Sequence, residues 1–447
     1  MKAFNNRKRI LIYSFFALSI LGLLSGCDGW IGKAEEPPLP GKRIPILLNT
    51  SPDQSLLVNE SFTVDLPIGL NIMDWPNAGG NDNHSMGHLY AGSGFKLKNS
   101  THLAGYNNSN KLISSPVIGE DKIFVLGTDN SVVAYSRNFK LLWKQQIMVE
   151  GDEDSGLGGG LSYEDGSIYV TTGSSQVHAL QASTGKILWT KNLIHPFRSS
   201  PIVSQGRVFV VNIMSQVFAL DISTGETLWS QQAFSEEISL LGGATPAVYE
   251  NILIVAHSSG EVFAHRVENG QVAWLENVHK KQLNGALNTF SDIISAPVID
   301  KDIAIVANHS NQIVAIDVRT GIQRWSAPYG TTKMPWVAGN VIYISTSDSK
   351  LVCLARDTGE QVWSSNLPSY LSPDDREDPI FWNGPILAGN RIMVTSNRGE
   401  VRFYEPVKGN KLSISSFHHG TSLPTLLVNG VYYFLDTAGN LLAYNSK

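Results

Sequence analysis

The sequence predicts an all-β chain folded as an eight-bladed β-propeller of four-stranded antiparallel blades, and three observations carry that prediction. A short phrase recurs along the chain, a proline precedes most copies at a nearly constant distance, and the last unit is cut short at the C-terminus. Units of this kind bury their faces against their neighbours, so repetition indicates a stacked or circular architecture. We therefore expect one closed ring over residues 70–447.

The repeated phrase is clearest in ALQASTGKILWT and ALDISTGETLWS, which share a glycine four residues before a tryptophan. Such a glycine supplies the positive φ of a tight hairpin, so we expect a turn between two strands there. One copy is a residue shorter and ends on Trp143, and another carries Ser413 where tryptophan is expected. The copies lie at 134–145, 179–190, 219–230, 264–275, 315–326, 353–364 and 403–415.

A second periodicity fixes the length of the unit. Prolines 116, 201, 246, 297, 335 and 385 precede the phrase, and each lies 27 or 28 residues before the tryptophan or its replacement. A unit that lacks the proline starts at Leu161, and Pro424 starts the last one, which makes eight units. Proline at the start of a strand removes no hydrogen bond from the sheet.

Each unit has the pattern of a four-stranded meander. The unit from Pro201 contains PIVSQG, RVFVVNIM, QVFALDI and ETLWSQQ, four β-prone segments separated by turn residues. Apolar residues on both faces mean that each sheet must be covered on two sides, which one unit alone cannot do.

The chain ends favour a ring over an open solenoid. The last unit stops after its third strand, NLLAYN, and the strand-like segment 92–100 (GSGFKLKNS) precedes the first unit without a unit of its own. If this segment supplies the missing fourth strand, the ring closes with no unpaired edge.

The N-terminus has the pattern of a targeting signal. Basic residues within 2–9 precede the apolar run 10–24, which at 15 residues is short for a membrane span. The following LSGC resembles the lipobox of bacterial lipoproteins, which implies a signal peptide at 1–26 and lipidation of Cys27, with palmitate among the acyl groups. Residues 27–69, rich in proline and charge, are expected to form a flexible tether.

Composition describes a folded chain with no basic face. Hydrophobic residues make up 42% and charged residues 16% of the sequence. The formal net charge is −5, and without the four basic residues of the signal it is −9, which argues against nucleic acid as a partner. Once Cys27 is lipidated only Cys353 remains, so we expect no intramolecular disulfide and a buried, hydrophobic Cys353.

The repeated phrase resembles the repeat of propellers of the pyrroloquinoline-quinone (PQQ) type over all eight units. That resemblance implies that the tryptophan packs between adjacent blades. With a lipobox, a tether and no further domain, the chain resembles the BamB family of outer-membrane assembly lipoproteins, and segment 74–89 is similar to one in α-proteobacterial members. The resemblance implies a non-catalytic, periplasm-facing outer-membrane scaffold without a cofactor. Its implied partners are the periplasmic POTRA domains of the barrel-forming subunit and unfolded outer-membrane proteins.

The same resemblance implies a docking site on two loops. The stretch ISLLGGATP matches an SLRG-like segment of the family and points to Ile238, Leu240 and Leu241, and FSDIISAP points to Asp292. Leu241 replaces the arginine of the family and Ile294 stands where a second aspartate is common, so the expected contact is more apolar and less charge-steered. The alternative is that the two leucines only anchor a loop under the blade edge.

Three further alternatives remain. A periplasmic PQQ-dependent quinoprotein dehydrogenase shares the fold, but its vicinal cysteine pair is missing. His84 and His88 are spaced four apart without a third ligand, so we expect no metal there. Asp28 resembles a signal that retains lipoproteins in the inner membrane, which leaves that location open.

Overall fold

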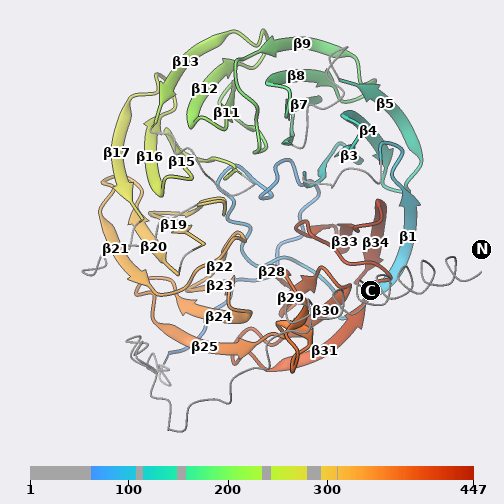
Figure 1. Cartoon of the computed structure of the whole chain (residues 1–447), viewed down its shortest axis with the longest axis vertical. Coiled ribbons are helices and arrows are strands. Elements are labelled where there is room, and N and C mark those ends of the chain that lie inside the picture. Colours follow the sequence, from blue (N-terminus) through green and yellow to red (C-terminus); the bar gives the residue numbers. More distant parts are fainter. Residues whose placement is uncertain are drawn as a thin grey trace, which may run out of the picture. The chain divides into compact units, whose positions relative to one another are not determined.

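The computed structural model describes residues 62–106, 114–147, 158–233, 243–278, 293–309 and 311–446. Within these ranges the regular structure is β-strand alone, arranged as eight four-stranded sheets around a ring and one two-stranded sheet (Figure 1). The predicted eight-bladed propeller is confirmed. We number the blades from 1 to 8 in chain order.

Blades 1 and 2 contain β2 (Val117–Gly119), β3 (Lys122–Leu126), β4 (Ser131–Ser136), β5 (Leu141–Gln146), β6 (Gly159–Glu164), β7 (Ser167–Thr172), β8 (Gln176–Gln181) and β9 (Ile187–Asn192). Blades 3 and 4 contain β10 (Ile202–Ser204), β11 (Arg207–Val211), β12 (Gln216–Asp221), β13 (Thr227–Gln232), β14 (Ala247–Tyr249), β15 (Ile252–Ala256), β16 (Glu261–Arg266) and β17 (Val272–Asn277).

Blades 5 and 6 contain β18 (Val298–Asp300), β19 (Ile303–Ala307), β20 (Ile313–Asp317), β21 (Gln323–Ala327), β22 (Trp336–Ala338), β23 (Val341–Ser345), β24 (Lys350–Ala355) and β25 (Gln361–Asn366). Blades 7 and 8 contain β28 (Trp382–Ala388), β29 (Arg391–Ser396), β30 (Glu400–Tyr404), β31 (Lys411–Ser416), β32 (Leu426–Val428), β33 (Val431–Leu435), β34 (Asn440–Asn445) and β1 (Lys96–His102).

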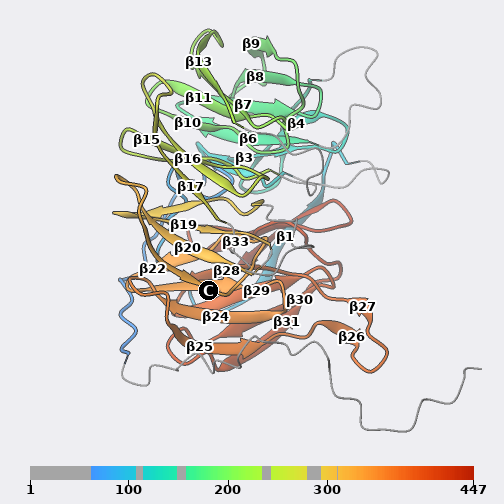
Figure 2. The same cartoon turned by 60° about the vertical axis from the view of Figure 1, so that its left-hand side comes forward.

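Strand order within the blades follows the predicted meander. In blades 1 to 7 the innermost strand comes first in the chain and the outermost last, whereas in blade 8 the outermost strand is β1; all pairs are antiparallel. β15 is buried along its whole length, whereas in the outer β17 exposed and buried residues are mixed. A small hairpin, β26 (Tyr370–Ser372) with β27 (Glu377–Pro379), leaves the ring between blades 6 and 7 (Figure 2).

The N-terminal strand closes the ring, as expected from the truncated last unit. β1 pairs with β34 from Lys96 opposite Asn445 to His102 opposite Asn440 (Figure 1). Phe95, just before β1, stacks on Tyr444 with ring centroids 4.5 Å apart and also contacts the rings of Phe403, Phe417, Tyr432 and Phe434. The closing segment is thus anchored both by the strand ladder and by an aromatic cluster shared between blades 7 and 8.

The tryptophan and the glycine of the repeated phrase join six of the eight pairs of neighbouring blades. Trp229 of blade 3 pairs with Ala219 and donates its indole N–H to the Val267 oxygen of blade 4 at 3.0 Å. Its ring lies on Gly270, where φ is +73° and an added Cβ would come within 2.6 Å of the ring. The turn therefore needs glycine for its backbone conformation and for room. Five further junctions repeat this arrangement: Trp143–Ala182–Gly185, Trp189–Ile222–Gly225, Trp274–Val318–Gly321, Trp325–Arg356–Gly359 and Trp363–Pro406–Gly409.

The two junctions that lack this contact flank blade 8. Blade 8 takes its fourth strand from β1, so no hairpin glycine joins β34 to that strand, and Ser413 of blade 7 stands at the tryptophan position opposite Phe403. In β1 the tryptophan position is Asn99, opposite Ala443, and its side-chain amide donates to the Asn138 oxygen of blade 1 at 2.9 Å. The loss of tryptophan at 413 follows from the closure of the ring.

Residues 70–90, which we call the axial loop, wind through the middle of the ring, where the blue trace is seen in Figure 1. The loop closes on itself, because Leu70 N donates to His88 O at 2.9 Å and Tyr90 N donates to Leu70 O at 2.8 Å. Residues 62–69, assigned to the tether by sequence, also contact the propeller: Asp65 N donates to Asn340 Oδ1 at 2.8 Å. The domain boundary near residue 70 stays a prediction.

Between its ends the axial loop contacts the blades in ring order. Ile72 O accepts from blade 8, Trp75 exchanges two backbone hydrogen bonds with Ile118 of blade 1, and Pro76 O accepts from Tyr163 N of blade 2. The Asp82 carboxylate bonds Ser204 of blade 3. The other blades are contacted through Val248 N to Asp82 O in blade 4, Ile299 N to Asn83 O in blade 5, Trp336 Nε1 to Gly87 O in blade 6 and Leu89 N to Leu387 O in blade 7. One segment of chain thus holds the inner ends of all eight blades.

Candidate functional site

The docking residues expected from the family resemblance, Ile238, Leu240, Leu241 and Asp292, lie outside the described residues. The structure does describe where the chain resumes after each of them. Gly243 and Ala244 lead into the innermost strand of blade 4, and Ile293 leads into that of blade 5. All three line one small pocket together with residues of blade 3. The ends of the two expected docking loops therefore converge on neighbouring blades.

These loop ends also border a larger cavity on the ring axis. Its volume is about 320 Å³, and every blade contributes lining residues from the start of its innermost strand. Gly243 and Thr245 come from blade 4 and residues 294–296 from blade 5. Trp75, Ala78 and Gly79 of the axial loop form another part of the wall. The described ends of the two loops and the axial cavity thus lie next to each other.

The cavity wall carries positive charge without a described negative partner. Arg198 of blade 3 and Lys333 of blade 6 are its charged lining residues, and no described acidic residue lines it. Lys333 is held by its backbone, since Lys333 N donates to Thr331 Oγ1 at 2.9 Å and Ser295 Oγ donates to Lys333 O at 3.1 Å. Burial lowers the pKa of Lys333, with no described carboxylate to raise it.

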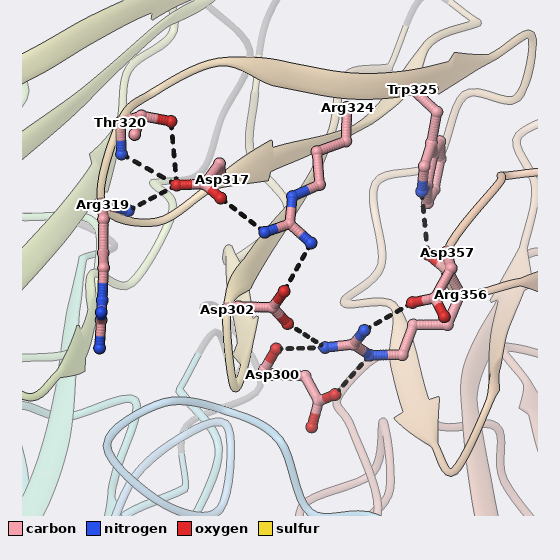
Figure 3. Close-up of polar contacts among 9 residues, drawn as sticks. All are labelled: Asp300, Asp302, Asp317, Arg319, Thr320, Arg324, Trp325, Arg356 and Asp357. Atoms are coloured by element: carbon pink, nitrogen blue, oxygen red, sulfur yellow. Dashed lines mark hydrogen bonds and ion pairs between the residues drawn. The ribbon is translucent and has the colours of Figure 1, made fainter.

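The opposite end of the inner strand of blade 5 carries an ion-pair network (Figure 3). Arg356 of blade 6, which is 8% exposed, bonds the Asp300 carboxylate at 2.6 Å and Asp302 at 3.0 Å. Arg324 links Asp302 to Asp317 within blade 5. These guanidinium groups, Arg356 first, hold the pKa of Asp302 at about 2.

The network is joined to the axial loop. Ser85 Oγ donates to Asp300 Oδ1 at 3.1 Å, and the neighbouring His84 Nδ1 lies 2.8 Å from Pro297 O. Asp300 and Pro297 are the two ends of the innermost segment of blade 5. The axial loop, the blade 5–6 junction and the strand that follows the Asp292 loop are therefore fixed as one unit.

The surroundings of His84, His88 and the free Cys353 are those of structural side chains. The pKa of buried His84 falls to about 4 because burial disfavours its charged form, and His88 Nδ1 lies 2.7 Å from Pro67 O. Within the described ranges no cluster of three metal-ligating side chains occurs. Cys353 is fully buried opposite Trp363, at the position that alanine takes in most blades, which confirms the interpretation as a small buried hydrophobe.

The expected membrane anchor lies outside the described residues. Cys27, Asp28 and the signal segment 1–26 precede residue 62, where the description starts. None of the described segments forms a helix of the length and apolarity that a membrane crossing needs.

Three features were not predicted from the sequence: the axial loop contacts, the Arg356 network and the two cations that line the cavity. The closest sequence signal was the position of Arg198 and Lys333, each a few residues before a blade-opening proline. That shared position places both side chains near the axis of a propeller, because every innermost strand starts there.

Comparison with known proteins gives a family match over the repeats. A protein-family model described as outer membrane protein assembly factor BamB matches residues 128–365. The outer membrane protein assembly factor BamB of Shigella dysenteriae is 32% identical over 234 residues, which cover 52% of this chain and 59% of that protein. The chain thus aligns with less than two thirds of the length of this relative.

Solved structures share the ring. The crystal structure of BamB from Moraxella catarrhalis aligns with a TM-score of 0.68 at 19% identity and covers 79% of this chain and 100% of that one. A europium-containing methanol dehydrogenase aligns with a TM-score of 0.65 at 14% identity and covers 81% and 89%. At these identities the likeness shows the fold alone, and the fold is common to an assembly factor and an oxidoreductase.

Proposed function

Because the chain belongs to the BamB family of outer membrane protein assembly factors, we propose that it is a non-catalytic scaffold of the outer-membrane β-barrel assembly machinery. In this proposal the ring presents its loops to the POTRA domains of the barrel-forming subunit. Unfolded outer-membrane proteins are a second partner, received along the exposed outer strands by strand addition.

One observation carries the docking proposal. The residues that follow the two docking loops, Gly243 and Ile293, line the same pocket on adjacent blades. Loops that end so close together can form one continuous contact, and the rigid blades beneath them keep the loop ends in place. Apolar Leu240 and Leu241 would supply the buried centre of that contact, with Ile238 beside them and Asp292 at its polar rim.

A lipid anchor would hold the scaffold at the membrane. The proposal places acyl groups on Cys27, residues 27–69 as the tether and the ring in the periplasm at the outer membrane. Several acyl chains, at about 0.8 kcal/mol per buried methylene, give stable anchoring, whereas a single chain is marginal. Asp28 is the residue that could redirect the protein to the inner membrane.

The docking proposal is tested by titrating purified POTRA domains of the barrel-forming subunit into the full chain in detergent. Leu240→Glu introduces a charge into the apolar centre, and we expect at least about a tenfold loss of affinity, or about 1.4 kcal/mol. Leu228→Glu is the matched control, because Leu228 is a 49% exposed leucine on the outer strand of blade 3. Equal affinity of both variants and the wild type would remove the loop from the interface.

The anchor is tested by membrane fractionation of the wild type, Cys27→Ser and Asp28→Ser. Cys27→Ser should leave the membrane fractions. Outer-membrane signal that is the same for the wild type and Asp28→Ser would show that Asp28 is not read as a retention signal.

The enzyme alternative has a direct test of its own. Reconstitution of the chain with pyrroloquinoline quinone and calcium should give no alcohol-dependent reduction of an electron acceptor. Saturable quinone binding with turnover would contradict the scaffold proposal.

A further inference from the structure

The axial cavity has the size of a small-molecule site. Its volume of about 320 Å³ lies at the lower end of the range for ligand pockets, which is about 300–1,000 Å³. It is walled by the starts of the innermost strands and by the axial loop, which hydrogen-bonds to the blades all around the ring. A cavity framed in this way is preformed, so a ligand would not have to order it.

The charge of the cavity selects an anion. Arg198 and Lys333 line it from blades that are three positions apart on the ring, and no described acidic residue lines it. Among the described residues neither side chain has an ion-pair partner, although the arginines of the blade 5–6 network are paired with carboxylates. A cation in a partly buried wall that has no ion-pair partner among the described residues costs free energy that an anionic ligand would recover.

The uncharged residues of the wall indicate which kind of ligand fits beside the two cations. Trp75, Met334, Trp336, Ile386 and Leu423 give apolar surface, and serine and threonine residues from several blades add hydroxyl groups. Two separate cations beside apolar surface suit a carboxylate on an apolar body. The described part of the chain has no helix N-terminus, which is a common binding site for phosphate.

We propose that the axial cavity binds the carboxylate of a small, largely apolar ligand, with Lys333 and Arg198 as the groups that receive the charge. Two sources share this chemistry: a free organic acid, and the C-terminal carboxylate of a polypeptide that enters the cavity from the axis. The proposal does not depend on docking to the barrel-forming subunit.

Calorimetric titration of the full chain in detergent tests the proposal with two pairs of probes. 4-Phenylbutyrate is compared with its neutral amide, and the peptide acetyl-Gly-Ala-Leu is compared with its C-terminal amide. We expect each acid to bind at least about tenfold more tightly than its amide, since a charged hydrogen bond is lost with the carboxylate. Tighter binding of phenylbutyrate identifies a free acid as the source, and tighter binding of the peptide acid identifies a chain terminus.

Substitutions assign the binding to the two cations. Lys333→Met and Arg198→Met should each weaken the acid at least about tenfold and leave the amide unchanged, and Lys333→Arg should retain affinity. Lys186→Met, at an exposed hairpin turn of blade 2, is the matched control. Far-UV circular dichroism and the thermal midpoint establish that each variant is folded.

Three results would overturn the proposal: equal affinity for acid and amide, no saturable binding of either acid, or unchanged affinity in folded Lys333→Met and Arg198→Met. The Leu240→Glu variant should bind the acids normally, so that a failure of docking and a failure of carboxylate binding are told apart.

Discussion

Substitution of the glycine on which each inter-blade tryptophan rests should destabilise the ring by a predictable amount. Gly359 of blade 6 has φ +73°, and an added Cβ would lie 2.4 Å from Cε3 of Trp325 in blade 5. Gly206 of blade 3 also has φ +73°, but a Cβ there meets no atom within 4 Å. The two positions therefore share the backbone strain and differ in the tryptophan contact.

The expected magnitudes follow from that difference. Gly206→Ala should lower the free energy of unfolding only through the left-handed backbone conformation, by about 1–2 kcal/mol. Gly359→Ala has the same backbone cost and must also displace the indole ring, and this overpacking adds about 1–3 kcal/mol. The displaced ring would also strain the hydrogen bond from Trp325 Nε1 to Arg356 O, now 2.9 Å long.

The assay is urea unfolding followed by far-UV circular dichroism, on the two single variants and on Trp325→Leu with and without Gly359→Ala. Leucine lacks the ring atoms that the new Cβ would meet, so Gly359→Ala should cost only about 1–2 kcal/mol in that background. The coupling between positions 325 and 359 is then about 1–3 kcal/mol. Equal effects of Gly206→Ala and Gly359→Ala on the free energy of unfolding, or the absence of coupling, would refute the stabilising contact between Gly359 and Trp325.

Three further outcomes are expected. Phe95→Ala should lower the free energy of unfolding by about 3 kcal/mol through loss of the aromatic cluster at the ring closure, whereas Phe381→Ala, at a 62% exposed ring, should change it by less than about 0.5 kcal/mol in the same urea titration. The folded-state pKa of His84, about 4, lies below its ordinary value of 6.5, so its contribution to stability is present above pH 6.5 and is lost as the pH falls towards 4; His84→Gln should reduce the loss of stability measured between these pH values, and an unchanged loss would contradict the assignment. Arg356→Met should cost about 2 kcal/mol at pH 7 and raise the pKa of Asp302 towards its ordinary value in a carboxyl NMR titration, while Arg319→Met, at an 83% exposed side chain, should do neither.

The blades could be predicted from sequence because their signals are local. Glycine four residues before tryptophan marks a hairpin, and the fixed interval from proline to tryptophan marks a unit, so the number of blades followed by counting. Closure by β1 followed from the missing fourth strand of the last unit. Even Ser413, an irregularity in the sequence, has a cause in the closure, since blade 8 offers no hairpin glycine for a tryptophan.

The axial loop and the candidate site could not be predicted in the same way. The loop has no strand periodicity, and its contacts, such as Trp75 with Ile118 and Asn83 with Ile299, join residues far apart in the sequence. Arg356 bonds Asp300 across 56 positions, and Arg198 and Lys333 line the same cavity only because the ring closes. The docking residues Ile238, Leu240, Leu241 and Asp292 lie outside the described residues and stay predictions.

Site-specific photo-crosslinking in cells tests the central claim, that this ring is a docking scaffold, most directly. A photoreactive amino acid is placed at Leu241 or at Asp292, and at Leu188 on the exposed outer strand of blade 2 as the control. The account predicts crosslinks to the barrel-forming subunit from positions 241 and 292 and none from position 188. Crosslinks to that subunit from position 188 alone, or from none of the three positions, would contradict it.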